Sequence, residues 1–273
     1  MNAYNNSFLL PFERNCDSTA YLQYMNSHWS DSIVYSIVYI AVIFAGKKWM
    51  ENRPRFDLRP CLATWSAVLG IFSLFGALRN VPELVSSVRD YGMEFSVCNK
   101  RYLLKVNGLW CCLFAISKVI ELGDTVFIVL RKQQLIFLHW YHHVTVLIYV
   151  WYMAHAQLGM GRWFIAMNYT VHAVMYSYYA LRAMKFRIPK FVSMAITSLQ
   201  ITQMVVGFSV TCYTYLLMQG DDTCLGESLI PVVYALLMYA SYFVLFARVF
   251  YVNYLAEKPK LGSHYTTNGK KLS

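Results

Sequence analysis

Residues 135–154 read LIFLHWYHHVTVLIYVWYMA, a stretch apolar enough to span a bilayer apart from the histidines at positions 139, 142 and 143. About twenty such residues suffice for a transmembrane helix. Ionisable side chains at membrane depth are costly, and they usually mark functional sites. On a helix these three positions share one face, at i, i+3 and i+4. The stretch therefore predicts a reaction site or a metal site inside a membrane protein, with simple polar contacts between helices as the alternative.

The rest of the 273-residue chain has the same membrane character. It is 58% hydrophobic and 14% charged, whereas soluble domains carry about 25% charged residues. We expect an all-α membrane protein with no separate soluble domain. It would comprise an N-terminal segment 1–31, a transmembrane domain 32–252 and a tail 253–273. The apolar runs predict seven transmembrane helices, near 32–46, 61–80, 108–130, 135–155, 163–184, 191–218 and 228–252.

The distribution of positive charge predicts the orientation of these helices. Of the 24 lysines and arginines, fifteen follow spans 1, 3, 5 and 7, and seven lie on the opposite side. Cytosolic loops carry the excess of such residues, so the C-terminus is expected in the cytosol and the N-terminus in the lumen. The net charge of +10 then needs no nucleic-acid partner.

Short signals at the two ends agree with this orientation. Asn5 begins a glycosylation sequon, which is usable only in the lumen. Lys270 and Lys271 resemble the dilysine retrieval signal of endoplasmic reticulum membrane proteins, although a solvated basic tail is the alternative. Cys98 and Cys224 both fall in loops assigned to the lumen, where oxidising conditions permit a disulfide between them.

Polar residues within the spans gather at one depth. Measured from the cytosolic end of each span, they form a band roughly 8–20 Å below the surface at 1.5 Å rise per residue. Four helices that point polar faces at one depth predict a chamber open to the cytosol, although separate hydrogen bonds between helices are an alternative. A structural ion pair of Lys118 with Glu121 or Asp124 also stays open. The band comprises, besides the three histidines, Lys118, Glu121, Asp124, Thr125, Asn168, His172, Tyr176, Tyr179, Thr197, Gln200 and Gln203.

Two kinds of chemistry fit such a chamber. Histidine clusters in membranes suggest a metal-dependent desaturase or hydroxylase, and zinc is also compatible with three or four ligands. Alternatively, an imidazole attacks a thioester to give an acyl-imidazole while a second histidine transfers protons. A dry chamber would protect that intermediate from water. A non-catalytic lipid or proton transporter is a weaker third hypothesis.

Four motifs in order resemble the very-long-chain fatty acid elongase family. They are Lys118-x-x-Glu121-x-x-Asp124-Thr125, His139-x-x-His142-His143, His172-x-x-Met175-Tyr176-x-Tyr178-Tyr179 and Thr197-x-x-Gln200-x-x-Gln203. The resemblance implies a 3-ketoacyl-CoA synthase of the endoplasmic reticulum, which condenses acyl-CoA with malonyl-CoA. The His-Trp-Tyr-His-His form is similar to the type-6 and type-3 branch, which acts on saturated and monounsaturated chains. The implied fold is a barrel of spans 2–7 around an acyl tunnel, with span 1 outside.

The same resemblance implies roles for individual residues. His142 matches the acyl-accepting nucleophile and His172 faces it, while His139 and His143 orient groups or transfer protons. The remaining polar residues of the band, apart from Thr125, are expected to contact substrate. No cofactor is expected. The expected partners are the two CoA substrates, membrane lipid, the reductase and dehydratase of the elongation cycle, and a second copy of the chain. The candidates for contacts with CoA phosphates are Lys118, Arg131, Lys132, Lys190 and Lys258.

Overall fold

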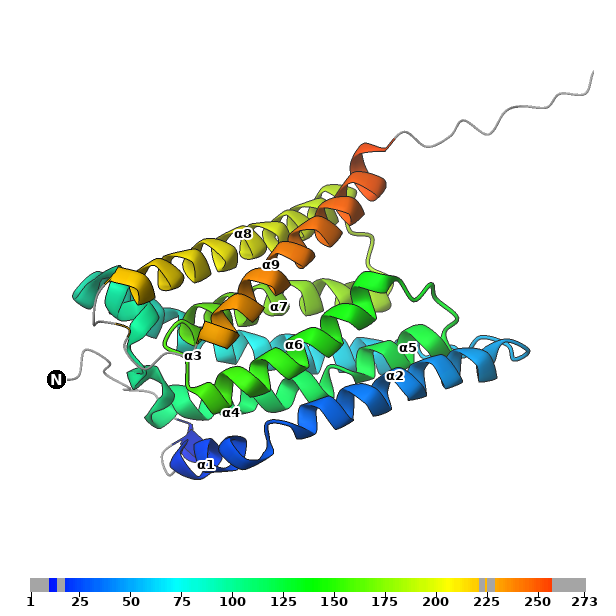
Figure 1. The fold of residues 1–273 in the computed structure, drawn as a ribbon. Coiled ribbons are helices and arrows are strands. Elements are labelled where there is room, and N and C mark those ends of the chain that lie inside the picture. Colours follow the sequence, from blue (N-terminus) through cyan, green and yellow to red (C-terminus); the bar gives the residue numbers. More distant parts are fainter. Residues whose placement is uncertain (1–9, 14–17, 221–223, 225–228, 257–273) are drawn as a thin grey trace, which may run out of the picture.

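The computed structural model describes residues 10–13, 18–220, 224 and 229–256. Their regular secondary structure is all helical, with no strand among them. The helices run side by side between two ends of an elongated bundle (Figure 1). Their bounds are α1 Ser18–His28, α2 Asp31–Met50, α3 Arg59–Cys98, α4 Lys105–Ile120, α5 Gly123–Leu130, α6 Phe137–Ala156, α7 Gly161–Ala183, α8 Lys190–Gly220 and α9 Leu229–Phe250. Short 3-10 helices cover Pro11–Glu13 and Arg101–Leu103, and a π-helical turn, Tyr251–Leu255, follows α9.

Among these residues, four helices are long and apolar enough to cross a membrane: α2, α3, α8 and the continuous segment Leu229–Leu255. The chain is therefore a multi-pass membrane protein. Helices α6 and α7 have 20 and 23 residues, which is long enough to span, but their histidine, tyrosine and other polar side chains lower the mean hydropathy. These polar side chains therefore make α6 and α7 harder to recognise as membrane spans from hydropathy.

The structure corrects several expected boundaries. Residues 108–130 were expected as one span, but α4 ends at Ile120 and α5 begins at Gly123. The backbone turns between them through i→i+3 hydrogen bonds from Leu122 to Val119 and from Asp124 to Glu121. A helix within 61–80 was expected, but α3 continues to Cys98 because Leu84 and Ser87 are buried on its inner face. The expected N-terminal segment also contains α1, whose Met25 packs in the core.

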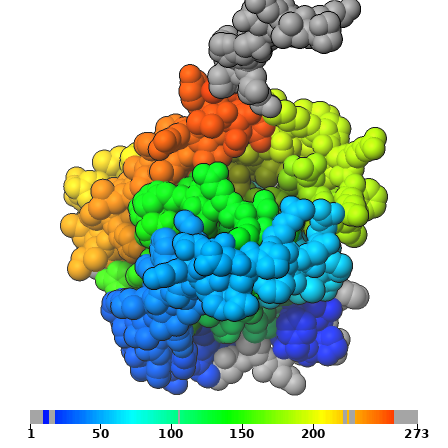
Figure 2. All heavy atoms as spheres, turned by 90° about the vertical axis from the view of Figure 1, so that its right-hand side faces the viewer, coloured from blue at the N-terminus to red at the C-terminus, as the bar shows by residue number. Residues whose placement is uncertain are grey.

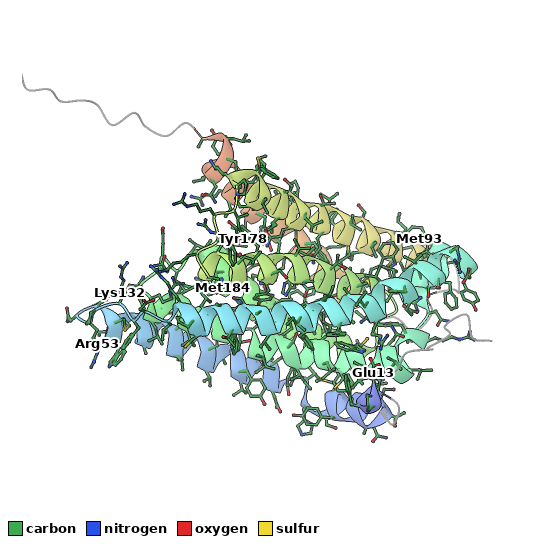
Figure 3. All side chains as sticks on the ribbon, turned by 180° about the vertical axis from the view of Figure 1, so that it is seen from behind. Glu13, Arg53, Met93, Lys132, Tyr178 and Met184 are labelled. Carbon is green, nitrogen blue, oxygen red and sulfur yellow. A yellow bond between two sulfur atoms is a disulfide. The ribbon has the colours of Figure 1, made fainter. Side chains whose placement is uncertain are left out.

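The two ends of the bundle differ in chemistry (Figure 3). The basic end consists of the connections 51–58, 131–136 and 184–189, and Figure 3 shows Arg53 and Lys132 there. The disulfide end consists of the connections 99–104 and 157–160, and it lies on the side of Met93 and Glu13. The expected disulfide is confirmed: Cys98 is bonded to Cys224, with 5.0 Å between the Cα atoms. It joins the end of α3 to the connection between α8 and α9.

A buried carboxylate fixes the N-terminal segment to the disulfide end. Glu13 accepts hydrogen bonds from Arg79 Nε at 2.8 Å, Arg79 Nη2 at 2.7 Å and Trp110 Nε1 at 2.8 Å. Burial alone would raise the pKa of Glu13, but the hydrogen bonds from Arg79 and Trp110 hold this pKa below its ordinary value. The ionised carboxylate therefore ties the segment to α3 and α4.

Glycine makes two features of α3 possible. A side chain at Gly76 would overlap the ring of Tyr169, so glycine allows α3 to approach α7 closely. Gly92 has φ 89° and ψ 171° and interrupts α3 six residues before Cys98. This backbone region is almost exclusive to glycine. The break redirects the last turn of α3 toward the disulfide.

We expect Gly92→Ala to lower the free energy of unfolding by about 1–3 kcal/mol, because alanine is strained at this φ and ψ. The open space around Gly92 makes backbone strain, and not a clash, the cause. The measurement is thermal unfolding of the purified protein in detergent. Gly220→Ala is the matched control, since Gly220 also has open space but lacks a positive φ. Equal midpoints for the two variants would contradict the strain argument.

Candidate active site

A cavity of about 360 Å³ lies among α5, α6, α7, α8 and α9. All four expected histidines line it: His139, His142 and His143 from α6, and His172 from α7. The expected chamber therefore exists, and the spacing within α6 does place the three rings on one wall. The other predicted polar residues that line it are Asp124, Asn168, Tyr176, Tyr179, Thr197, Gln200 and Gln203.

A second cavity of about 690 Å³ approaches the histidines from the basic end, between α3, α5 and α7. We call it the basic funnel, because its lining includes Arg59, Arg131, Arg182, Lys185 and Arg187. Figure 2 views the molecule from this end. The funnel and the chamber adjoin each other, since they share five lining residues: Asp124, His139, Tyr176, Tyr178 and Tyr179.

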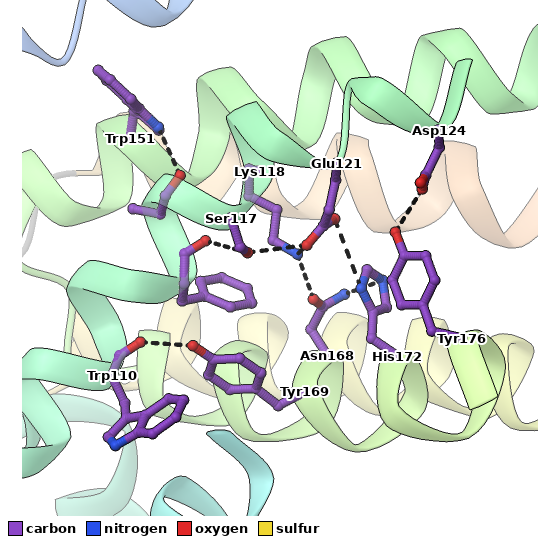
Figure 4. Close-up of polar contacts among 12 residues, drawn as sticks. Trp110, Ser117, Lys118, Glu121, Asp124, Trp151, Asn168, Tyr169, His172 and Tyr176 are labelled. Carbon is purple, nitrogen blue, oxygen red and sulfur yellow. Dashed lines mark hydrogen bonds and ion pairs between the residues drawn. The ribbon is translucent and has the colours of Figure 1, made fainter. Parts of the chain in front are cut away.

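A network of buried polar groups supports one side of the chamber (Figure 4). Lys118 Nζ donates to Glu121 Oε1 at 2.7 Å and to Asn168 Oδ1 at 2.8 Å. Ser117 Oγ donates to the same Glu121 oxygen at 3.0 Å. The side chains of Lys118 and Glu121 are only 2% and 4% exposed. The network joins the end of α4 to the middle of α7.

These contacts fix the hydrogen-bonding state of His172. Because Asn168 Oδ1 accepts from Lys118, the Asn168 amide nitrogen must donate, and it lies 3.1 Å from His172 Nε2. His172 Nε2 is then an acceptor, and the ring carries its proton on Nδ1, which lies 3.7 Å from Glu121 Oε2. The ion pair thus orients the Asn168 amide, and the amide in turn orients the His172 imidazole.

Lys118 forms a structural ion pair, which the sequence had allowed as an alternative to a contact with substrate. It is absent from the linings of both cavities and is enclosed by Glu121, Asn168 and the ring of Phe114. Arg131 lines the basic funnel. Lys132 Nζ donates to the Glu51 carbonyl at 2.9 Å, and Lys190 Nζ lies 5.4 Å from the Tyr254 ring centroid. Asn5, Lys258, Lys270 and Lys271 lie outside the described residues.

Two aromatic residues that were not predicted complete the hydrogen bonds of the site. Trp65 Nε1 donates to Asp124 Oδ1 at 2.6 Å, while Tyr176 donates to Asp124 Oδ2 at 2.6 Å. Tyr39 in α2 is hydrogen-bonded to Thr125 at 2.7 Å, and Thr125 to His139 Nε2 at 2.9 Å. No sequence signal separated Trp65 and Tyr39 from the many aromatic residues of the apolar spans.

The rings of the α6 histidines lie close to one another and to α9. Ring centroids are 4.5 Å apart for His139 and His143, and 5.6 Å for His142 and His143. The His142 ring also lies 5.0 Å from the ring of Tyr242. Within the described chain, no three His, Cys, Asp or Glu side chains converge in the manner of a metal site.

The chamber narrows beyond His142 toward the disulfide end. A small continuation of about 30 Å³ is lined by His142, Asn168 and Gln203 and otherwise by apolar or aromatic side chains, including Phe114, Tyr149, Phe164, Met204 and Tyr239. A cavity of this size has room for about one or two water molecules. Its lining suits an apolar chain, provided that flexible methionine side chains move to admit it.

Comparison with known proteins places most of the helical region in one family. The ELO model, described as the GNS1/SUR4 family, matches residues 24–261. Very long chain fatty acid elongase 6 from Drosophila melanogaster is 48% identical over 92% of this chain and 81% of its own. The Homo sapiens elongase 6 is 44% identical over 91% of this chain and 94% of its own, and the Homo sapiens elongase 3 is 39% identical over 87% of each.

We expect Lys118→Met to lower the free energy of unfolding by about 3–5 kcal/mol, because it leaves the Glu121 carboxylate buried without its cation. Thermal unfolding in detergent measures this change. Replacing both partners, as Lys118→Met with Glu121→Met, should recover part of the loss, since no unpaired charge then remains. Arg131→Met, in the lining of the basic funnel, is the control and should leave the midpoint nearly unchanged. A stable Lys118→Met protein would contradict the structural role.

Proposed function

The chain belongs to the ELO (GNS1/SUR4) family, and we propose that it condenses long-chain acyl-CoA with malonyl-CoA, the first step of fatty acid chain elongation. The products are 3-ketoacyl-CoA, carbon dioxide and CoA. The observation that carries this proposal is the convergence of four histidines on one membrane-embedded chamber. The matched relatives, named very long chain fatty acid elongases, support the same reaction.

In the proposed mechanism, His142 is the nucleophile. Its imidazole nitrogen forms a bond to the acyl carbonyl carbon as the carbon–sulfur bond breaks, and CoA leaves as the thiol with the imidazole proton. Loss of carbon dioxide from malonyl-CoA then gives an enolate, whose carbon bonds to the acyl carbon. The bond between that carbon and the imidazole nitrogen breaks, and the departing nitrogen takes up one proton, which restores neutral His142. No cofactor is needed for this sequence. His142 suits the role because it lines both the chamber and the narrow apolar continuation.

The neighbouring groups have roles that follow from their contacts. His172 is oriented by Asn168 and Glu121, so it is placed to exchange protons on the opposite wall. Arg131 and other cations of the basic funnel suit the phosphates of CoA, whose charge they would balance. The remaining polar side chains of the chamber would position the thioester and the malonyl group.

We further propose that this is a seven-span protein of the endoplasmic reticulum. Helices α4 and α5 together form the third span, and the helices from α3 to α9 enclose the acyl tunnel, with α2 outside. The basic end then faces the cytosol, as the excess of positive charge predicts. The disulfide end faces the lumen, where oxidising conditions support the Cys98–Cys224 bond. Association with the reductase and dehydratase of the cycle, or with a second copy, belongs to the same proposal.

We expect His142→Ala to lower elongation activity by at least about thousandfold, as loss of a catalytic nucleophile typically does. The assay follows labelled malonyl-CoA into product. Intact mass after incubation with acyl-CoA alone should show one added acyl group on the parent and none on the variant. His155→Ala, in the same helix but outside the chamber lining, is the matched control and should stay active. Full activity of His142→Ala would reject this residue as the nucleophile.

Metal analysis tests the alternative of a metal-dependent desaturase or hydroxylase. Purified protein that condenses the two substrates without stoichiometric iron or zinc supports the proposal. A requirement for either metal would reject the metal-free mechanism.

Substrate choice should follow the shape of the narrow continuation. Each buried methylene contributes about 0.8 kcal/mol until the tube is full, after which further length is disfavoured. We expect activity to rise with chain length and then drop sharply, with an optimum near palmitoyl among saturated and monounsaturated acyl-CoAs. Competition between equal acyl-CoA mixtures measures this profile. A clear preference for polyunsaturated chains of about twenty or more carbons would contradict it, since kinked chains are expected to fit a narrow tube poorly.

A further inference from the structure

Helix α2 lies at the edge of the bundle (Figure 1). One of its side chains, Tyr39, nevertheless connects to the site by hydrogen bonds. The helix packs against α5 and α6 through a narrow stripe, and its other faces are exposed and apolar, with Ile37 63% and Val42 56% exposed. Tyr39 is the aromatic member of the buried stripe and is 6% exposed. The stripe comprises Ser32, Ser36, Tyr39, Ile43 and Met50.

Tyr39 begins a chain of two hydrogen bonds that ends on a histidine of the chamber. Its hydroxyl lies 2.7 Å from Thr125 Oγ1, and Thr125 Oγ1 lies 2.9 Å from His139 Nε2. Thr125 is completely buried. The chain therefore runs from α2 through α5 to α6 inside the protein.

The directions of these bonds follow from the number of protons. Each hydroxyl has one proton, and a buried proton without an acceptor costs about 1–3 kcal/mol. If Tyr39 donates to Thr125 and Thr125 donates to His139 Nε2, both hydroxyl protons are used. If His139 donated from Nε2, one hydroxyl proton would have no acceptor among the described residues, because neither hydroxyl has another hydrogen-bond partner there. The first arrangement is therefore the stable one.

That arrangement determines the tautomer of His139. With Nε2 accepting, the neutral ring carries its proton on Nδ1. His139 is only partly buried, and it lines both the chamber and the basic funnel. The N–H that remains available to a substrate is thus the Nδ1–H.

We propose that Tyr39 is a positioning residue of the condensation, which holds His139 in the tautomer that donates from Nδ1 to a substrate carbonyl oxygen. The inference rests on the proposed function. Negative charge develops on a carbonyl oxygen three times in that reaction: when the thioester is attacked, when malonyl-CoA loses carbon dioxide, and when the enolate carbon attacks the acyl-imidazole. A donor fixed before the reaction stabilises such an oxygen more effectively than one that must reorient. A helix outside the proposed tunnel thereby contributes to catalysis.

The test compares single hydroxyl removals in the full-length protein, purified in detergent. Tyr39→Phe removes only the first donor and should lower kcat about tenfold, the value of one hydrogen bond, while leaving KM for both CoA substrates within about twofold. Tyr35→Phe is the matched control, because Tyr35 lies one turn away on α2 and packs its ring against Trp151. Tyr35→Phe should leave kcat, KM and the unfolding midpoint unchanged.

Variants at the middle of the chain separate positioning from packing. Thr125→Val keeps the shape but removes the hydroxyl, and it should lower kcat about hundredfold, as loss of an oxyanion donor does. Thr125→Ser keeps the hydroxyl and should retain most of the activity. Tyr39→Phe added to Thr125→Val should cost nothing more, because the chain is already broken.

The outcomes distinguish this inference from the proposed function. If the parent elongates acyl-CoA but Tyr39→Phe keeps kcat within about twofold, the positioning role is wrong and the condensation stands. The positioning role is also wrong if Tyr39→Phe changes KM in place of kcat, or if its loss of activity follows a lowered unfolding midpoint. It is equally wrong if the losses of Tyr39→Phe and Thr125→Val multiply in the double variant. A parent protein without malonyl-CoA-dependent elongation would reject the proposed function itself.

Discussion

The ion pair of Lys118 and Glu121 is the interaction on which the site depends. Two charges nearly removed from solvent at the core of an apolar bundle are tolerable only when each has partners. Glu121 accepts from Lys118 and Ser117, and Lys118 donates also to Asn168. Because Asn168 lies on α7, satisfying the charges fixes α4 against α7 and aligns the amide with His172. One electrostatic requirement thus sets both the helix packing and the orientation of an imidazole.

The turn between α4 and α5 is the second consequence of placing polar groups at this depth. It follows Glu121 directly, and Gly123 allows the close approach of Trp65, which a Cβ at that position would meet at 2.7 Å. Trp65 then donates to Asp124, and Thr125 faces Tyr39. A continuous helix would keep residues 121, 124 and 125 on one face. In the interrupted helix, Glu121 contacts α7, Asp124 contacts α3 and Thr125 contacts α2.

Sequence spacing predicted the parts of the site that lie within single helices. The histidines of α6 and the steps of three and four in α7 and α8 follow from helical periodicity alone, and they do line one chamber. Partners between helices were not predictable in this way. Tyr39 and Thr125 are 86 positions apart, and Trp65 and Asp124 are 59 apart, so only packing brings them together. The extension of α3 was missed because its polar residues after Asn80 resemble a loop until their burial is seen.

The order of chemistry along the bundle explains why the reaction would occur at the depth of the histidines. Cations line the basic funnel, hydrogen-bonded polar groups surround the chamber, and mostly apolar and aromatic side chains line the narrow continuation. A CoA thioester has the matching order: phosphates, amides and thioester, acyl chain. Its phosphates cannot pass beyond the funnel without losing water and their counter-charges, while its acyl chain gains free energy by going deeper. The two tendencies act on opposite ends of one molecule, so in the proposed complex the thioester between them would lie beside His142.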